Sequence, residues 1–383
     1  MNFFIHYPVL GIGGAERSLI RLSDYLINHG HDVTLLLTTK GGQLESELNK
    51  KIKIIYLRKK AYGVKFKRSV NLFEKLKAVP DAFMYFYERG REYIVKQSLS
   101  KIKYDVAIVM IHSLRPATCM KYIQYNKLFQ WIRNDLGQYP KNDRFIKILR
   151  QYSEDIDAYI CVSQVARDSI AALEPKVDHK AYVVHNFYNT SEIIELSNRG
   201  EDPYLKLCGN ETRIVTVGRL LDADKAIFRI LDACEILVAR KLKFIWFLIG
   251  DGPDKAEMED RIKKRGLSSF IYLLGAKENP YPYYKWADFS ATLSNYEGLC
   301  GVVSEAKVLN KAVIATRFSG IEEQLENNIN GLIVEQNIDS IVTGLQLLIG
   351  NKEVLHRLAK KPLPAVLLDN SIKYNKLLSL ILN

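Results

Sequence analysis

The feature that most constrains this chain is the alternation of short apolar segments with segments of helical period. This pattern predicts doubly wound α/β domains built on parallel sheets. In the first half, the expected strands are Asn2–His6, Asp32–Leu37, Ile52–Leu57, Asp105–Ile111, Lys127–Ile132, Ala158–Val162 and Ala181–Val184. The expected helices between them are Ala15–His29, Pro116–Tyr125, Arg144–Asp155 and Val165–Leu173.

The alternation restarts after a polar stretch. We interpret Phe187–Asn210, which contains two glycines and a proline, as a linker. Beyond it, the expected strands are Arg213–Val217, Phe244–Ile249, Phe270–Leu274, Phe289–Leu293, Val313–Ala315 and Gly331–Val334. The expected helices are Ala223–Arg240, Asp254–Arg265, Val302–Leu309, Ile321–Asn327 and Ile338–Ile349, and an amphipathic segment, Ser371–Leu382, closes the chain. The 383 residues are therefore expected to form two Rossmann-like domains facing each other across a ligand cleft.

Composition excludes several classes of protein. No apolar run approaches the roughly 18 residues that span a bilayer, and the N-terminus reads as a first strand and not as a signal peptide. The five cysteines are odd in number and widely spaced, which argues against both a disulfide framework and a metal site. A reducing cytoplasm is the expected location.

The net charge of +12 is concentrated in one segment. Between Arg58 and Lys103 there are 13 Lys/Arg and 4 Asp/Glu, interleaved with aromatic residues. This mixture favours an anionic membrane surface as a partner. A solvated helix pair with inward-packed aromatics and a nucleic-acid site are the alternatives.

Two glycine-rich turns follow expected strands. The turn at Gly11–Glu16 precedes a helix, so its backbone can approach a phosphate or sugar at the helix N-terminus. It is not a dinucleotide fingerprint, because Glu16 stands where the last glycine would be. Gly250–Pro253 makes a second tight turn, whose backbone near Gly252 is a candidate contact for a nucleobase; a purely structural turn is the alternative.

Charged residues gather after two other strands. Arg219 and Lys225 are candidates to clamp a diphosphate; a pair of surface charges without a ligand is the alternative. Glu297 and Glu305 flank a glycine-containing loop and the start of a helix near Gly301. Phosphate suits a helix N-terminus, and the two carboxylates suit polyol hydroxyls on either side.

Taken together, these motifs resemble the family-4 retaining glycosyltransferases of GT-B fold. The resemblance rests on Gly13–Glu16, Gly218–Leu220, Gly250–Pro253, the pair Glu297 and Glu305 with seven residues between them, and Asn330–Ile333. It covers nearly the whole chain, and the two-glutamate motif is its specific part. One departure is Ala226, where the family commonly has glycine or another small or basic residue.

The resemblance implies a domain plan. Residues 1–190 would form an acceptor-binding domain, residues 191–365 a nucleotide-sugar-binding domain, and residues 366–383 a helix that crosses back to the first. It also implies a role for each matching residue. Glu305 would bind the ribose, Glu297 the donor sugar, and Arg219 and Lys225 the diphosphate. The remaining donor-binding positions would be Gly13, Gly14, Gly218, Gly252, Gly298, Leu299 and Gly301.

His112, at a strand end, matches the position of the family's active-site histidine. Arg133, Asn134 and Asp135 follow another strand and are candidates to face the acceptor.

The expected activity is transfer of a sugar from a nucleotide sugar, UDP before GDP, with retention and without a metal or other cofactor. The expected acceptor is a glycan or polyprenyl-diphosphate-linked glycan in bacterial surface polysaccharide synthesis, at the inner face of the plasma membrane. The alternatives are a catalytically silent GT-B-like protein that binds a partner or glycan, a nicotinamide-dependent oxidoreductase, and a sugar-nucleotide hydrolase or epimerase. Glu297, Glu305, Arg219 and Lys225 together argue against the first, and the incomplete glycine fingerprint argues against the second.

Overall fold

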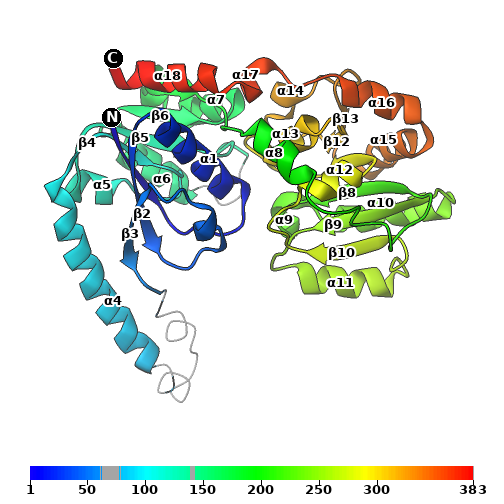
Figure 1. Cartoon of the computed structure of the whole chain (residues 1–383), viewed down its shortest axis with the longest axis horizontal. Coiled ribbons are helices and arrows are strands. Elements are labelled where there is room, and N and C mark those ends of the chain that lie inside the picture. The colour runs from blue at the N-terminus through cyan, green and yellow to red at the C-terminus, as the bar shows by residue number, and fades with distance from the viewer. Residues whose placement is uncertain (61, 63–76, 78, 139–142, 383) are drawn as a thin grey trace. The chain divides into compact units, whose positions relative to one another are not determined.

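The chain divides into two compact units in a computed structural model that describes residues 1–60, 62, 77, 79–138 and 143–382 (Figure 1). Unit 1 comprises Met1–Val162, Arg167–Val184 and Tyr374–Asn383. Unit 2 comprises Ser163–Ala166 and His185–Lys373. Each has its own sheet and core, so the expectation of two Rossmann-like domains is confirmed. No helix in the described ranges is both long and apolar enough to cross a bilayer.

Unit 1 contains a seven-stranded sheet in the order β3-β2-β1-β4-β5-β6-β7, and all its pairings are parallel. The strands are β1 (Asn2–Tyr7), β2 (Asp32–Thr39), β3 (Lys53–Arg58), β4 (Lys103–Val109), β5 (Gln124–Ile132), β6 (Ala158–Cys161) and β7 (Ala181–Val183). The helices are α1 (Gly14–Asn28), α4 (Val79–Ser98), α5 (Ala117–Tyr122), α6 (Asp143–Gln151), α7 (Gln164–Leu173) and most of α18 (Asn370–Leu382). The central strand β1 lies between β2 and β4, with Ile5 opposite Leu35 and Ile108 in the fully buried centre of the sheet.

Unit 2 contains a six-stranded parallel sheet in the order β10-β9-β8-β11-β12-β13. The strands are β8 (Thr212–Val217), β9 (Phe244–Ile249), β10 (Ile271–Gly275), β11 (Phe289–Thr292), β12 (Ala312–Thr316) and β13 (Leu332–Val334). The helices are α8 (Thr190–Ser197), α9 (Asp222–Lys225), α10 (Phe228–Ala239), α11 (Lys255–Lys264), α12 (Tyr281–Trp286), α13 (Gly301–Val308), α14 (Ile321–Gln324), α15 (Ile338–Gly350), α16 (Lys352–Lys360) and α17 (Ala365–Leu368). Every residue of β9 is buried, as expected for a strand covered on both faces.

The interpretation of residues 187–210 as a linker is wrong. This stretch includes helix α8, which begins at the cap Asn189 and buries Ile193. Tyr204 is fully buried: its ring stacks on Phe247 with centroids 4.0 Å apart, and its hydroxyl donates to the main-chain oxygen of Tyr283 at 2.8 Å. A few anchoring aromatic and aliphatic side chains therefore pack a segment whose average composition is polar.

The expected helix Ala223–Arg240 is interrupted. It forms two helices, α9 and α10, and the break lies at Ala226, which has the left-handed conformation φ 46°, ψ 48°. This conformation costs a residue with a Cβ about 1–2 kcal/mol relative to the right-handed one. The break ends α9 at Lys225 and so fixes the position of that lysine beyond the carboxyl end of the central strand β8.

Gly252 allows the loops after β8 and β9 to touch. A Cβ at position 252 would lie 2.2 Å from the main-chain oxygen of Leu220. The same two loops are joined by hydrogen bonds from Leu220 N to Asp251 O (3.0 Å) and from Asp254 N to Leu220 O (3.1 Å). The glycine is thus required by close packing of two backbones.

We expect Gly252→Ala to lower the free energy of unfolding by about 1–3 kcal/mol, because neither backbone can move without breaking these bonds. The change is measured by urea denaturation. The control is Gly209→Ala, where the nearest atom to a new Cβ is 3.5 Å away. Equal midpoints for the two variants would contradict this account of the turn.

Candidate functional site

An ion pair joins the loops that follow β8 and β11 in unit 2. Lys225, the last residue of α9, forms an ion pair with the carboxylate of Glu297, and Ser294 donates its hydroxyl to Oε1 of the same carboxylate at 3.0 Å. Burial lowers the pKa of Lys225, but the charge and hydrogen bond of Glu297 raise it by more, so the net pKa lies above the ordinary lysine value. Lys225 is therefore a cation at neutral pH.

Backbone and side-chain contacts hold the two loops in register. The amide of Asn295 donates to the main-chain oxygen of Asp224 at 2.8 Å. Arg229, on α10, donates to the side chain of Asn295 at 2.8 Å and to the main-chain oxygen of Leu293 at 3.1 Å. The position of Glu297 relative to Lys225 thus depends on a fixed framework.

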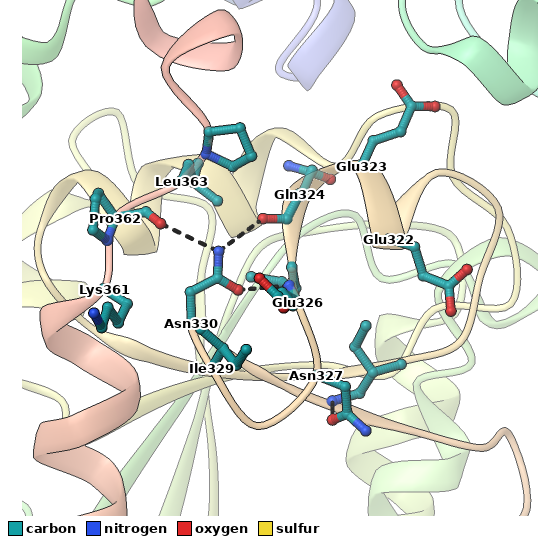
Figure 2. A pocket seen from close by; sticks show the side chains of 13 residues that line it. Glu322, Glu323, Gln324, Glu326, Asn327, Ile329, Asn330, Lys361, Pro362 and Leu363 are labelled. Atoms are coloured by element: carbon teal, nitrogen blue, oxygen red, sulfur yellow. Dashed lines mark hydrogen bonds between the residues drawn. The ribbon is translucent and has the colours of Figure 1, made fainter.

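The N-terminus of α13 is positioned by a buried amide. Gln324 accepts from the main-chain N–H of Cys300, the N-cap residue, and donates to its main-chain oxygen, both at 2.9 Å. Its amide also lies 2.9 Å from the hydroxyl of Ser304 in the first turn. Asn330 in turn holds the Gln324 backbone: its side chain donates to the main-chain oxygens of Gln324 (3.3 Å) and Pro362 (3.2 Å), as Figure 2 shows. Two amide side chains therefore connect the segment at Asn330–Ile333 to the start of α13.

Close backbone packing also fixes the loop at Gly298. Gly320 has a φ of 80°, and a Cβ there would lie 2.4 Å from the main-chain oxygen of Gly298. Both the conformation and the contact require glycine. The loop after β12 thus supports the buried residues Gly298 and Leu299 of the loop after β11.

Glu305 lies one turn further along α13 and is only 6% exposed. Its carboxylate accepts a hydrogen bond from the hydroxyl of Tyr281 at 3.4 Å.

The side chain of Arg219, in contrast, is exposed, and its guanidinium forms no hydrogen bond or ion pair with a described residue. A cavity of about 20 Å³, room for one water, is lined by Gly218, Arg219, Lys225, Ser294 and Val302 among others, and marks where these loops converge.

A larger cavity, of about 620 Å³, lies elsewhere in unit 2. Figure 2 shows its lining around Asn330, with the carboxylates of Glu322 and Glu323 directed away from that amide. No residue predicted for the site lines this cavity.

In unit 1, Gly13 and Gly14 stand at the start of α1. Gly13 is the N-cap, in extended conformation, and a Cβ on Gly14 would meet nothing within 4 Å. The carboxylate of Glu16 folds back beside Gly13, where it lies at the positive end of the helix.

His112 is buried beyond the end of β4. Its Nδ1 accepts the main-chain N–H of Arg133 at 3.3 Å, and its ring meets that of Phe145 edge-on at 4.7 Å. Because Nδ1 accepts, the neutral ring carries its proton on Nε2. Burial, and secondly the charge of Arg133, lower the pKa of His112 to about 4, so this histidine is neutral at pH 7.

The structure gives two of the three candidate acceptor-facing residues internal contacts. Arg133 is buried and donates to Ser18 of α1 at 2.9 Å and to the main-chain oxygen of Met110 at 3.4 Å. Asp135 is buried and accepts the main-chain N–H of Gly137 at 2.9 Å. Asn134 is half-buried. Contact of these residues with an acceptor stays a prediction.

Comparison with known proteins places this chain in a family. Residues 12–192 match the family model "Glycosyltransferase Family 4", and residues 203–362 match "Glycosyl transferases group 1". Together the two matches cover most of the chain. Fold similarity agrees: the structure of a mutant of S. aureus TarM in complex with Fondaparinux, alpha-GlcNAc-glycerol and UDP has a TM-score of 0.76 at 12% identity, covering 99% of both chains. This chain belongs to the family-4 glycosyltransferases of GT-B fold.

Two relatives in sequence add detail. An uncharacterised glycosyltransferase of Methanocaldococcus jannaschii is 25% identical over 59% of this chain and 59% of its own length. The N-acetylgalactosamine-N,N'-diacetylbacillosaminyl-diphospho-undecaprenol 4-alpha-N-acetylgalactosaminyltransferase of Campylobacter jejuni is 32% identical over 41% of this chain and 42% of its own length. In both, the match spans less than two thirds of the relative.

Sequence reasoning assigned no role to four residues that shape this candidate site: Ser294, Gly320, Gln324 and Tyr281. Ser294 begins the loop that contains Glu297, and Gly320 follows an expected strand. Gln324 and Tyr281 carry no such signal, since their partners lie 24 residues away in the sequence. Within the ranges that the structure describes, no three histidine, cysteine or acidic side chains gather as a metal site.

The neutral, buried state of His112 predicts a pH dependence of stability. Unfolding restores the ordinary pKa of 6.5, so between pH 6.5 and about 4 the unfolded chain binds the extra proton. The contribution of neutral His112 to the free energy of unfolding is fully present above pH 6.5. It falls by on the order of 3 kcal/mol as the pH drops to about 4. We expect His112→Asn to remove this part of the acid sensitivity in urea titrations across that range. The exposed His356→Asn is the control, and an unchanged pH profile in the His112 variant would count against the assignment.

Proposed function

We propose that this glycosyltransferase is a retaining, metal-independent hexosyltransferase that uses a UDP-sugar, with a GDP-sugar as second choice. The proposed acceptor is a glycan or polyprenyl-diphosphate-linked glycan, in bacterial surface polysaccharide synthesis at the cytoplasmic face of the membrane. The observation that carries the proposal is the Lys225–Glu297 pair with Ser294, at the carboxyl ends of β8 and β11. Two comparisons support the substrate classes: the staphylococcal structure contains UDP, and the Campylobacter enzyme's name gives a diphospho-undecaprenol acceptor.

The charge arrangement suits a nucleoside diphosphate leaving group. Cleavage of the sugar–phosphate bond places negative charge on the phosphate, which preorganised cations stabilise. Lys225 is held as a cation near the start of α13, and Arg219 is exposed without a described partner. Arg219 can bind two phosphate oxygens at once, while Lys225 acts as a point charge. Arg219 and Lys225 would thus neutralise the negative charge of the leaving diphosphate.

The pairing of Glu297 favours a positioning role for this carboxylate. Its Oε1 already accepts from both Lys225 and Ser294, which lowers its strength as a nucleophile. Retention then follows from front-side attack: the acceptor oxygen bonds to the anomeric carbon on the side from which the phosphate departs, and the phosphate takes the acceptor proton. Glu297 would hold the donor-sugar hydroxyls, and Glu305 the ribose.

We assign supporting roles to unit 1. The open space at Gly14 lets a backbone N–H at the start of α1 approach a phosphate. His112, neutral and fixed through Nδ1, offers an N–H donor at Nε2 to a sugar hydroxyl. Arg133 holds that ring and joins it to α1 through Ser18.

Nucleotide binding is tested by thermal shift with UDP, GDP, ADP and CMP at millimolar concentration. A ligand present at about 100 times its Kd stabilises the native state by about 2.7 kcal/mol, which raises Tm by several degrees. We expect UDP to give the largest shift, and Glu305→Ala to abolish it. The control is Glu353→Ala, an exposed glutamate of α16. The absence of a shift with any nucleotide would reject the transferase proposal in favour of a silent binding protein.

Turnover tests the role of Glu297. Glu297→Gln keeps the side-chain shape but leaves Lys225 without its counter-charge, so we expect kcat to fall about 100-fold or more while the UDP shift persists. EDTA is expected to leave wild-type turnover unchanged. Near-wild-type kcat in the variant would refute the assignment of Glu297, and loss of turnover in EDTA would refute metal independence.

A further inference from the structure

Helix α4 of unit 1 has charged residues on its buried face and apolar residues on its exposed face, the reverse of an ordinary amphipathic helix. Its buried residues are the two glutamates Glu88 and Glu92, which are 3% and 5% exposed. Five of its aromatic and aliphatic side chains point to solvent: Phe83, Phe86, Tyr87, Tyr93 and Ile94 are each 60–71% exposed, whereas Met84, Tyr85 and Val95 are partly buried. The alternative in which the aromatics of this segment pack inward is therefore wrong for α4. Phe66 and Phe73, also in the basic segment, lie outside the described residues.

Charged contacts attach α4 to the edge of the sheet. Glu92 accepts from Arg58 at 2.7 Å and pairs with Lys96 at 2.6 Å and with Arg89 at 2.9 Å. Glu88 accepts the main-chain N–H of Lys59 at 2.8 Å. Arg58 is the last residue of the edge strand β3, so these bonds fasten the helix to that strand (Figure 1).

A third contact covers the backbone of the edge strand. Arg91 donates to the main-chain oxygen of Leu57 at 3.2 Å and lies 3.7 Å from Glu88. Burial raises the pKa of Glu92, but its hydrogen bonds from Lys96 and Arg58 lower it by more, so Glu92 stays ionised at neutral pH. None of these hydrogen bonds and ion pairs involves an outward-facing apolar side chain of α4.

The outward side chains form one continuous stripe. At 100° per residue, Phe83, Phe86, Tyr87, Tyr93 and Ile94 fall within about 120° of one another, opposite Glu88 and Glu92. From Phe83 to Ile94 the stripe is about 17 Å long. Solvent-exposed apolar area of this extent marks an interaction surface. We call these five residues the α4 aromatic face.

We propose that the α4 aromatic face docks on the surface of an anionic lipid bilayer. The inference takes one premise from the proposed function, namely that the acceptor lies at a membrane. Phe and Tyr side chains suit the headgroup region, where an apolar ring meets water at its edge.

Charge selects anionic lipid over a protein partner. Exposed basic residues lie on and near α4: Lys59, Lys60, Lys101, Lys103 and Arg89, of which Arg89 also pairs with Glu92. Each such residue near an anionic surface contributes about 1 kcal/mol. The charges of Glu88 and Glu92 are offset by their ion pairs with Arg91 and with Arg58 and Lys96, respectively. Five exposed cations therefore lie on or near α4, against the three acids of the helix, Asp81, Glu88 and Glu92.

Vesicle flotation tests the proposal. We expect the full chain to bind phosphatidylcholine/phosphatidylglycerol (7:3) vesicles, and to bind pure phosphatidylcholine at least tenfold more weakly. Replacing Phe83, Phe86 and Tyr87 together by serine should reduce binding to the mixed vesicles at least tenfold without lowering Tm, because these side chains are exposed. The matched control replaces three exposed apolar residues outside α4, Ile194, Leu205 and Leu382, by serine and should bind like wild type.

A fluorescent reporter places the contact. Phe86→Trp should show a blue-shifted emission with mixed vesicles and quenching by brominated lipid, whereas Leu205→Trp should show neither. Equal vesicle binding by the triple variant and wild type would overturn the proposal. So would a wild-type dimer in sedimentation that the triple variant abolishes, with no vesicle binding, because the face would then join two copies of the chain.

The same preparations separate this inference from the proposed function. A UDP shift with no vesicle binding rejects only the docking surface. Vesicle binding through α4 with no nucleotide shift rejects only the transferase proposal. Both readouts are therefore measured on each variant.

Discussion

The site in unit 2 depends on one buried amide, the side chain of Gln324. It satisfies both the N–H and the C=O of Cys300 at the residue where a loop becomes helix α13. A helix N-terminus leaves several N–H groups without partners, and their direction is set by the cap residue. By fixing that residue, Gln324 fixes where the positive end of α13 points. Asn330 extends the same support by one step, since it holds the Gln324 backbone.

The charges around Lys225 balance before any substrate arrives. A lysine so placed would be costly to keep charged without Glu297, and Glu297 would be costly without Lys225 and Ser294. The pair is thus stable by itself. Under the proposed function, an incoming diphosphate would share the lysine with the carboxylate, and the exposed Arg219 would meet the phosphate first. Lys225, which is paired with Glu297, and Arg219, which is exposed, therefore differ in how freely they could contact a ligand.

Sequence patterns predicted the two sheets, because buried parallel strands are short apolar runs and both sheets consist of them. They also predicted that Glu297 lies in a loop and Glu305 in the following helix. They did not predict the break at Ala226, since alanine is a strong helix former and only tertiary contacts hold it in a left-handed conformation. They did not predict the contacts of Gln324 or Tyr281, because those contacts depend on how distant loops meet. The orientation of α4 was equally out of reach. Its composition is that of a helix with an apolar inner face, and only the side chain of Arg58 at the end of β3 and the main-chain N–H of Lys59 after it favour the opposite.

Because polar contacts hold α4 to its domain, the composition of its exposed face is not constrained by the stability of the fold in the way that an ordinary amphipathic helix is. In most amphipathic helices the apolar stripe holds the helix to its domain, so mutation of that stripe is limited by stability. Here the hydrogen bonds and ion pairs between α4 and β3 come from Arg58, Arg91 and the two buried glutamates, and none involves the α4 aromatic face. Substitutions on the outer face are therefore expected to leave the fold intact. An enzyme built this way can change the surface that it recognises during evolution without first acquiring a more stable core.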